Sequence, residues 1–280
     1  MNTSAEEQFL DTLLEDLEND KLVLPTLPEV ALKVRDTLED ENSSLSDVAK
    51  IINSDAALAA RMIQVANSPL LRATRSIETV EAAVARMGSN MIRNLVMSMV
   101  MEQMFQATSD VTDSRLRKIW EHSTEVAAIS HALAAQLTKL EPEQAMLAGL
   151  IHDIGTLPIL TRAEDYPDLL DDPETLDRII RDTHTTIGGE ILRKWNFPQE
   201  LIAVAEEHEN FHRASTSDID YADIVIVANL QSLIDTNHPH TTKDWSNIPA
   251  FGKLGLQADV NVVDIDGMNA DIEATLTVLK

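Results

Sequence analysis

The sequence predicts an all-α protein, and three observations support this prediction. The chain has only 8 glycines and 10 prolines in 280 residues, and most stand where a helix would begin or end. Apolar residues recur at intervals of three and four along most of the chain, which is the period of an amphipathic helix. Strand signals are nearly absent, because the apolar run at 225–227 lies within a helical stripe that includes Ile219, Ile226 and Leu230.

Residues 1–20 predict an acidic amphipathic helix. Ser4 and Glu7 have the spacing of a capping box, in which each side chain accepts a hydrogen bond from the other residue's backbone amide. Phe9, Leu13 and Leu17 form one apolar face. The simpler interpretation is a solvated helix that packs on the rest of the protein, and the alternative is a helix that binds a partner.

Residues 21–112 predict an N-terminal helical subdomain. The stiff segment 24–28 precedes a helix for which Pro28 suits the first position. Further helices are expected around 45–52, from the N-cap Asp55 to 66, up to 87, and from 89 to 105. Gly88 is placed as the left-handed terminator between the last two helices. The polar stretch at 108–113 marks the predicted boundary.

Residues 113–235 predict a second helical subdomain, and residues 236–280 a C-terminal loop and tail. A long helix through Trp120 is followed by one that starts at Pro142 and runs into His152 and Asp153. The proline- and acid-rich segment 157–173 is expected to be a loop. Helices are then expected at 176–195, 198–208 and 220–234, and again at the end of the tail.

Charge and composition limit the possible partners and compartments. The chain carries 47 acidic and 22 basic side chains, a formal charge of −25. Phosphate backbones and anionic membranes repel such a chain, so we expect neither nucleic acid nor membrane as a partner. No apolar run reaches the roughly 18 residues of a membrane span, and no basic segment opens a signal peptide, so cytoplasm is the expected compartment.

The absence of cysteine excludes disulfides and thiolate zinc sites. Any metal site must use histidine, aspartate and glutamate, a ligand set that suits iron, manganese, magnesium or zinc. His152 and Asp153 are the leading candidates. Adjacent helical residues diverge by about 100°, but at a helix end before Gly155 the backbone can turn both side chains toward one point.

Three further histidines lie on the inward faces of separate predicted helices. His184 aligns with Ile180 and Ile187, His208 aligns with Leu201 and Ala205, and His122 stands one turn before Val126. One such histidine is usually a hydrogen-bonded core residue. Three of them together favour a shared site. The remaining histidines lack this pattern, and the segment 238–240 is expected to be an exposed loop; they are His131, His212, His238 and His240.

Several separated motifs resemble a known family. The sequence Leu-Ile-His-Asp-Ile-Gly at 150–155 resembles the signature of the HD superfamily of metal-dependent phosphohydrolases, with matching motifs at 120–123 and 184–188. From about residue 24 to 234 the chain is similar to the HDOD family, the HD-related output domains of bacterial signalling proteins. Its markers are at 24–29, 55–58, 65–68 and 195–198.

The resemblance implies an HD-like helical bundle with an additional N-terminal helical subdomain. Carried over from catalytic relatives, it implies six candidate metal ligands: His122, His152, Asp153, His184, Glu207 and His208. If the site were active, Asp153 would orient a water molecule and His184 would protonate the leaving oxygen.

The sequence also departs from the catalytic relatives. Glu207 and His208 replace a pair of histidines, Asn229 replaces a late aspartate, Thr156 replaces a lysine, and no Gly-Tyr-Pro motif is present. Most of these changes remove charge that would bind a metal or a phosphate. Among the basic residues, only Arg181 is near enough in sequence to the candidate ligands to bind a phosphate beside them.

Two main hypotheses follow from these residues. The first is a signalling module that has a degenerate HD site and binds partner proteins or a small ligand. Its HD site holds either a divalent metal or none. The alternative is a metal-dependent phosphohydrolase acting on a nucleotide or phosphate ester. A metal-binding or oxygen-sensing protein without turnover is a third, lesser interpretation.

Overall fold

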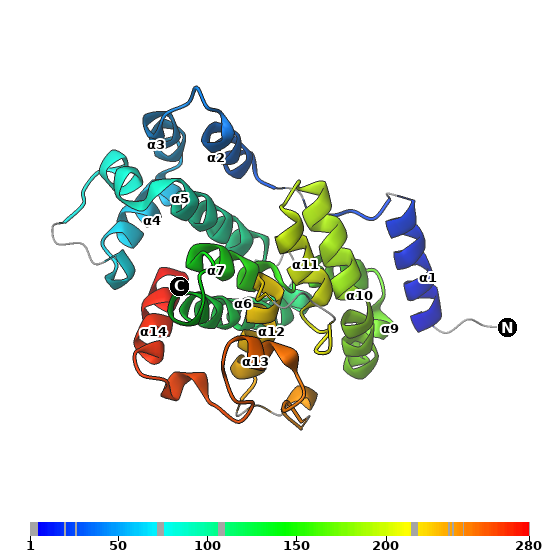
Figure 1. Ribbon diagram of the computed structural model, residues 1–280. Helices are drawn as coiled ribbons and strands as arrows, with labels where there is room; N and C mark the ends of the chain where they lie inside the picture. The colour runs from blue at the N-terminus through cyan, green and yellow to red at the C-terminus, as the bar shows by residue number, and fades with distance from the viewer. Residues whose placement is uncertain are drawn as a thin grey trace.

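The computed structural model describes residues 5–19, 21–25, 27–71, 76–105, 110–213, 218–234, 236, 238–242 and 244–279. Within these ranges the chain forms helices and turns and contains no strand, which confirms the predicted all-α class (Figure 1). No helix in the described ranges is both long enough and apolar enough to cross a membrane.

The N-terminal subdomain packs α2 (Glu29–Glu39), α3 (Leu45–Asn53) and α4 (Ala56–Ala66), followed by the 3₁₀ turn η1 (Pro69–Leu71), against α5 (Val80–Met104). As predicted, Asp55 caps α4 by accepting hydrogen bonds from the backbone amides of Ala57 and Leu58. Gly88 interrupts α5 with a φ of +75°, a conformation that costs glycine little. The predicted break is therefore confirmed, as a kink between two helical pieces.

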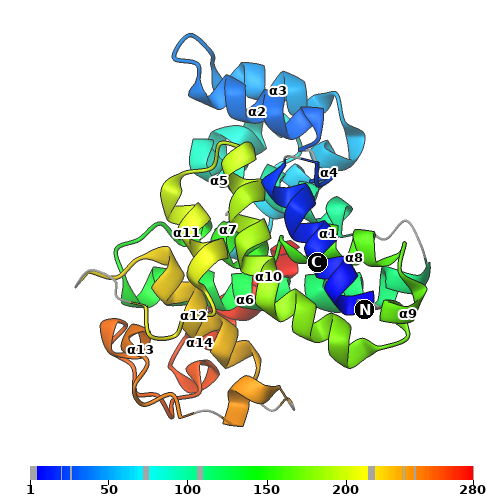
Figure 2. The ribbon, with the colours of Figure 1, turned by 90° about the vertical axis from the view of Figure 1, so that its right-hand side faces the viewer.

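Helix α1 (Ala5–Glu18) lies beside α9 (Pro167–Leu170) and α10 (Pro173–Lys194), away from the N-terminal subdomain that follows it (Figures 1 and 2). Phe9 is fully buried and meets the ring of Tyr166 edge-on, with centroids 5.1 Å apart. Arg178 pairs with Glu6 at 2.6 Å. The helix is thus packed on the body of the protein, and the predicted Ser4–Glu7 capping box involves side chains outside the described part.

The second subdomain is built around the long helix α6 (Asp110–Leu137). Helices α7 (Pro142–Ile151) and α12 (Tyr221–Ser232) pack along α6. Helix α11 (Gln199–Glu207) packs on α7 and α12, and α10 packs on α11. The expected loop at 157–173 was wrong, because it contains α8 (Thr156–Ala163) and α9 (Pro167–Leu170). Pro158 lies in the first turn of α8, where its missing amide hydrogen leaves no helical hydrogen bond unmade.

The C-terminal segment is part of this bundle. It contains the 3₁₀ turn η2 (Pro239–Thr242), α13 (Pro249–Lys253), the 3₁₀ turn η3 (Val262–Asp264) and α14 (Met268–Leu279). Helix α14 packs on α6, where His131 Nδ1 lies 3.3 Å from Thr275 Oγ1. The expectation of an exposed loop at 238–240 was wrong for His240, which is buried.

Candidate metal centre

The end of α7 positions the central pair of the candidate site. His152 caps α7 and Asp153 lies in the turn that leads to α8. Two glycines allow the neighbouring helices to approach: a Cβ on Gly149 would lie 2.5 Å from the Ala127 Cα of α6, and one on Gly155 would lie 1.9 Å from the backbone oxygen of His184 on α10. Side-chain carbons do not reach such distances, so both close contacts require glycine.

Five of the six predicted ligand residues converge at this point. Asp153 divides its carboxylate oxygens between two sets of histidines. Its Oδ2 lies 3.3 Å from His152 Nε2, whereas its Oδ1 lies 3.4 Å from His184 Nε2 and 3.3 Å from His208 Nε2. The result is two overlapping ligand triads: His122, His152 and Asp153 form the first, and Asp153, His184 and His208 form the second, with the ligand atoms of each triad within 4.8 Å of one another. We call these five residues the HD cluster.

The backbone orients the histidine rings. The Nδ1 atoms of His152 and His184 lie 2.7 and 2.8 Å from the carbonyl oxygens of Gly149 and Ile180, and His208 Nδ1 lies 3.1 Å from that of Val204. Because a carbonyl accepts, each Nδ1 carries the hydrogen and each Nε2 presents its lone pair to the cluster when the ring is neutral. Metal-bound histidines are oriented in the same way.

The cluster leaves one buried ring nitrogen without a hydrogen bond. His152 is fully buried, and its Nε2 has no hydrogen-bond partner among the described residues. A buried polar atom in this state carries an energetic cost that a metal ion would remove. Borderline divalent ions accept a set of imidazole nitrogens and one carboxylate, so the residues present fit a metal.

Burial and mutual charge set the pKa values in the HD cluster. Burial, reinforced by His152, lowers the pKa of His122 to about 4, and burial also lowers the pKa of His208. Burial opposes ionisation of Asp153, but the surrounding histidines outweigh it and hold the Asp153 pKa well below its usual range. Burial likewise opposes charging of His152, and Asp153 outweighs it, so the His152 pKa is raised. Neutral His122 and His208 beside an ionised Asp153 are the forms that bind metal.

The structure does not bring Glu207 to the HD cluster. Its side chain forms an ion pair with Arg213 instead. Glu207 ends α11 while His208 is the cap, and adjacent residues there point in different directions. Glu209, in the turn that follows, lines the cavity beside Asp153 and His184 in its place.

A cavity of about 810 Å³ opens onto Asp153 and His184. Three basic side chains line it, Arg115 and Lys118 from α6 and Arg181 from α10, although the chain as a whole is strongly acidic. Arg115 also pairs with Asp177 at 2.5 Å. The sequence carried a signal for these residues, since positions 115, 118 and 122 share one helical face. The expectation of a single arginine near the site was therefore wrong.

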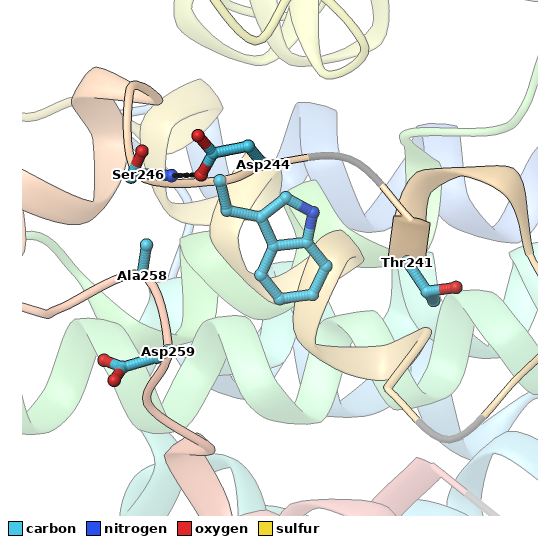
Figure 3. A pocket seen from close by; sticks show the side chains of 6 residues that line it. Thr241, Asp244, Ser246, Ala258 and Asp259 are labelled. Atoms are coloured by element: carbon cyan, nitrogen blue, oxygen red, sulfur yellow. Dashed lines mark hydrogen bonds between the residues drawn. The ribbon is translucent and has the colours of Figure 1, made fainter.

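A separate open cavity of about 400 Å³ lies in the C-terminal segment (Figure 3). Its walls include Thr241, Asp244, Trp245, Ala258 and Asp259, and a hydrogen bond from the Ser246 amide to Asp244 closes one turn beside it. Exposed carboxylates such as these are common without a function, so the HD cluster remains the candidate site.

Solved structures share this fold. A crystal structure from Shewanella amazonensis SB2B, provisionally named a metal-dependent phosphohydrolase, is 31% identical, with a TM-score of 0.86 and coverage of 99% of this chain and 100% of that one. An HDOD domain protein of unknown function from Geobacter sulfurreducens is 21% identical, with a TM-score of 0.68 over 98% and 99% of the two chains, and shows the fold alone.

Sequence relatives cover parts of longer proteins. An uncharacterised protein of Treponema pallidum (strain Nichols) is 26% identical over 68% of this chain and 38% of its own length. Ribonuclease Y of Chlorobaculum tepidum is 35% identical over 42% of this chain and 18% of its own length. This chain thus spans well under half the length of either relative. The family model of the HDOD domain matches residues 24–211, which is most of the chain. The protein belongs to the HDOD family.

Proposed function

We propose that this protein is a regulatory HDOD module whose HD cluster binds divalent metal and, through it, a phosphate-bearing small ligand. The observation that carries the proposal is the division of the Asp153 oxygens between two histidine sets, at the opening of a cavity that basic side chains line. Structural histidines would need only hydrogen bonds to each other, whereas His152 Nε2 is buried without one.

The ligand class follows from the charges around the cavity. Arg115, Lys118 and Arg181 line the cavity, although the chain as a whole is strongly acidic. Guanidinium and ammonium groups bind phosphate oxygens through charge-assisted hydrogen bonds. A metal ion at the HD cluster would supply a Lewis acid for a phosphate oxygen and would lower the pKa of bound water.

Hydrolysis of a phosphate ester is the second candidate function, and the same basic residues favour it because a developing phosphate charge needs cations nearby. Two substitutions weigh against it. Asn229, nearly buried in the wall beside His122, is a neutral ligand, and Thr156 offers no charge. The Asp153–His184–His208 triad does not depend on Asn229, so metal binding survives this loss more readily than turnover does.

Metal analysis of protein purified without chelator tests the proposal. We expect one or two equivalents of metal per chain, lost in His152→Ala and kept in His212→Ala, a matched control because His212 is exposed and outside the cluster. Calorimetric titration of the manganese-loaded protein with inorganic phosphate, compared with Arg181→Ala, then tests the cavity. Release of nitrophenol from bis(4-nitrophenyl) phosphate would favour the hydrolase. Absence of metal from the wild-type protein, even after loading with manganese, would refute metal binding.

A further inference from the structure

A further cavity lies between the two helical subdomains and is distinct from the HD cluster. Its volume is about 110 Å³, and none of the five cluster residues lines it. Helices α2 and α5 form one side, and α7 and the start of α11 form the other. The walls are mostly apolar and include Leu27, Met97, Leu147, Phe197 and Leu201. The cavity can therefore enclose an apolar group that neither subdomain would bury alone.

One wall of this cavity joins the family markers at 24–29 and 195–198. Trp195 Nε1 donates a hydrogen bond to the Pro25 carbonyl at 3.1 Å, and Arg35 donates one to the Trp195 carbonyl at 2.9 Å. These bonds hold the markers together across the two subdomains. They also occupy the guanidinium of Arg35, which lines the cavity as well.

Two polar side chains from α5 line the cavity without a hydrogen-bond partner. Asn94 is only 3% exposed, and its side-chain amide makes no hydrogen bond to the described residues. Arg93 is half-buried, its Nε is buried without a partner, and its guanidinium forms no ion pair within the described part of the chain. This is unexpected where 47 acidic side chains accompany 22 basic ones. Unpaired buried polar groups are costly, so the cavity suits a ligand that would satisfy them.

The unpaired guanidinium of Arg93 selects a monoanion. Arginine presents a planar fork of N–H donors that matches a carboxylate, and the Asn94 amide can donate a further hydrogen bond. A phosphate dianion carries more charge than one arginine neutralises, and apolar walls cannot solvate the remainder. Glu39 also lines the cavity, but this residue is exposed, where water and salt screen its charge. A single carboxylate is therefore the anion that fits.

The volume limits the apolar part of the ligand. An engineered cavity of about 150 Å³ holds benzene, so a cavity of about 110 Å³ holds a smaller body of about four carbons. We propose that this cavity binds a short-chain aliphatic carboxylate, with the carboxylate at Arg93 and Asn94 and the apolar chain between Met97 and Leu147. Binding here is independent of metal at the HD cluster, so either site can fail without the other.

Isothermal titration calorimetry of the full chain with sodium isovalerate tests this proposal. Acetate has the same charge without the apolar body, and isovaleramide has nearly the same shape without the charge. We expect saturable binding of isovalerate, and affinities lower by about tenfold or more for acetate and isovaleramide, because acetate buries less apolar area and isovaleramide lacks the charge-assisted hydrogen bond.

Two further measurements locate the ligand. Arg93→Gln should lower the affinity for isovalerate about tenfold. Lys33→Gln, the matched control, should leave it unchanged, because the Lys33 side chain is 58% exposed on α2 and does not line the cavity. In NMR spectra of the methionine methyl groups, the Met97 signal is assigned by its absence from Met97→Leu. It should shift during the titration of the wild type, whereas the signal of Met268, outside the cavity, should not.

The outcomes decide the question in either direction. No saturable binding of isovalerate to the wild type, or an unchanged Met97 signal, would overturn the site. Equal affinities for isovalerate and acetate would show that the apolar walls take no part, and would overturn it too. Binding that is lost in Arg181→Ala but kept in Arg93→Gln would place the carboxylate at the HD cluster instead. Circular dichroism checks the fold of each variant; if Arg93→Gln does not fold, the Met97 shift in the wild type decides.

Discussion

Replacing Gly155 by alanine should separate α10 from the start of α8 and disturb the HD cluster. The new Cβ would lie 1.9 Å from the His184 oxygen and 2.6 Å from the Gly188 nitrogen. Both atoms belong to the backbone and cannot rotate away, so α10 must retreat by about 1.1 Å for the closer contact to reach the 3.0 Å that real Cβ atoms respect. His184 Nε2, now 3.4 Å from Asp153 Oδ1, is carried on the segment that moves.

The free energy of unfolding should fall by about 2–3 kcal/mol, which is the upper part of the range for overpacking. For a domain of this size that lowers Tm by about 4–12 °C. Metal affinity should fall by about 10–100-fold, as when groups that position metal ligands are altered. Thermal denaturation followed by circular dichroism gives the first quantity, and manganese dialysis gives the second.

Gly252→Ala is the matched control for this substitution. Gly252 lies in α13, and a Cβ there would meet no heavy atom within 4 Å. Alanine is the better helix former by up to about 1 kcal/mol, so this variant should be as stable as the wild type or slightly more stable. Equal Tm values for the two variants would refute the claim that close backbone approach at Gly155 holds α10 in place.

Three further perturbations have defined outcomes. Burial lowers the pKa of His131, so the unfolded chain takes up a proton on this histidine before the folded chain does, and the free energy of unfolding falls as the pH drops below about 6.5. In His131→Gln the free energy of unfolding, measured by chemical denaturation, should depend less steeply on pH, by up to about 1.4 kcal/mol per pH unit. An unchanged slope contradicts this. Asn229→Asp should raise the affinity for manganese about tenfold, because a carboxylate is a better ligand than an amide. It should also lower the Tm of the metal-free protein. A lower manganese affinity in dialysis would contradict this prediction. Phe9→Ala should remove about 3–5 kcal/mol of packing energy between α1 and the rest of the protein and release α1. Trypsin should then cleave at Lys21 faster than in Gln8→Ala, the control at an exposed position of the same helix. Equal cleavage rates would show that Phe9 does not hold the helix.

Much of the fold was predictable because helical signals are local. The Asp55 cap and the break at Gly88 follow from the chemistry of single residues, and the structure places both as predicted. The segment 157–173 departs from the prediction because Pro158 and the acidic residues are typical of loops. The helical spacing of Leu157, Leu160 and Ala163, all buried in α8, was the stronger signal.

The candidate site was predictable only in part. The convergence of five cluster residues was expected from the helical faces of the histidines, whereas metal binding by them stays a prediction. Glu207 and Glu209 could not be told apart, because the turn after α11 sets their directions and that turn depends on tertiary packing. His240 carried no local signal at all, because its burial depends on Phe211 and Trp245, which precede and follow it in sequence.

The double use of Asp153 has a consequence for how such proteins diverge. Each of its oxygens faces a different histidine set, so a single Asp153→Asn substitution would remove the carboxylate from both ligand triads at once. Asparagine has nearly the same shape, and the glycines that fix the surrounding helices would be untouched. A lineage could therefore lose its chemistry in one mutational step while inheriting an intact scaffold, free to be recruited as a surface for recognition.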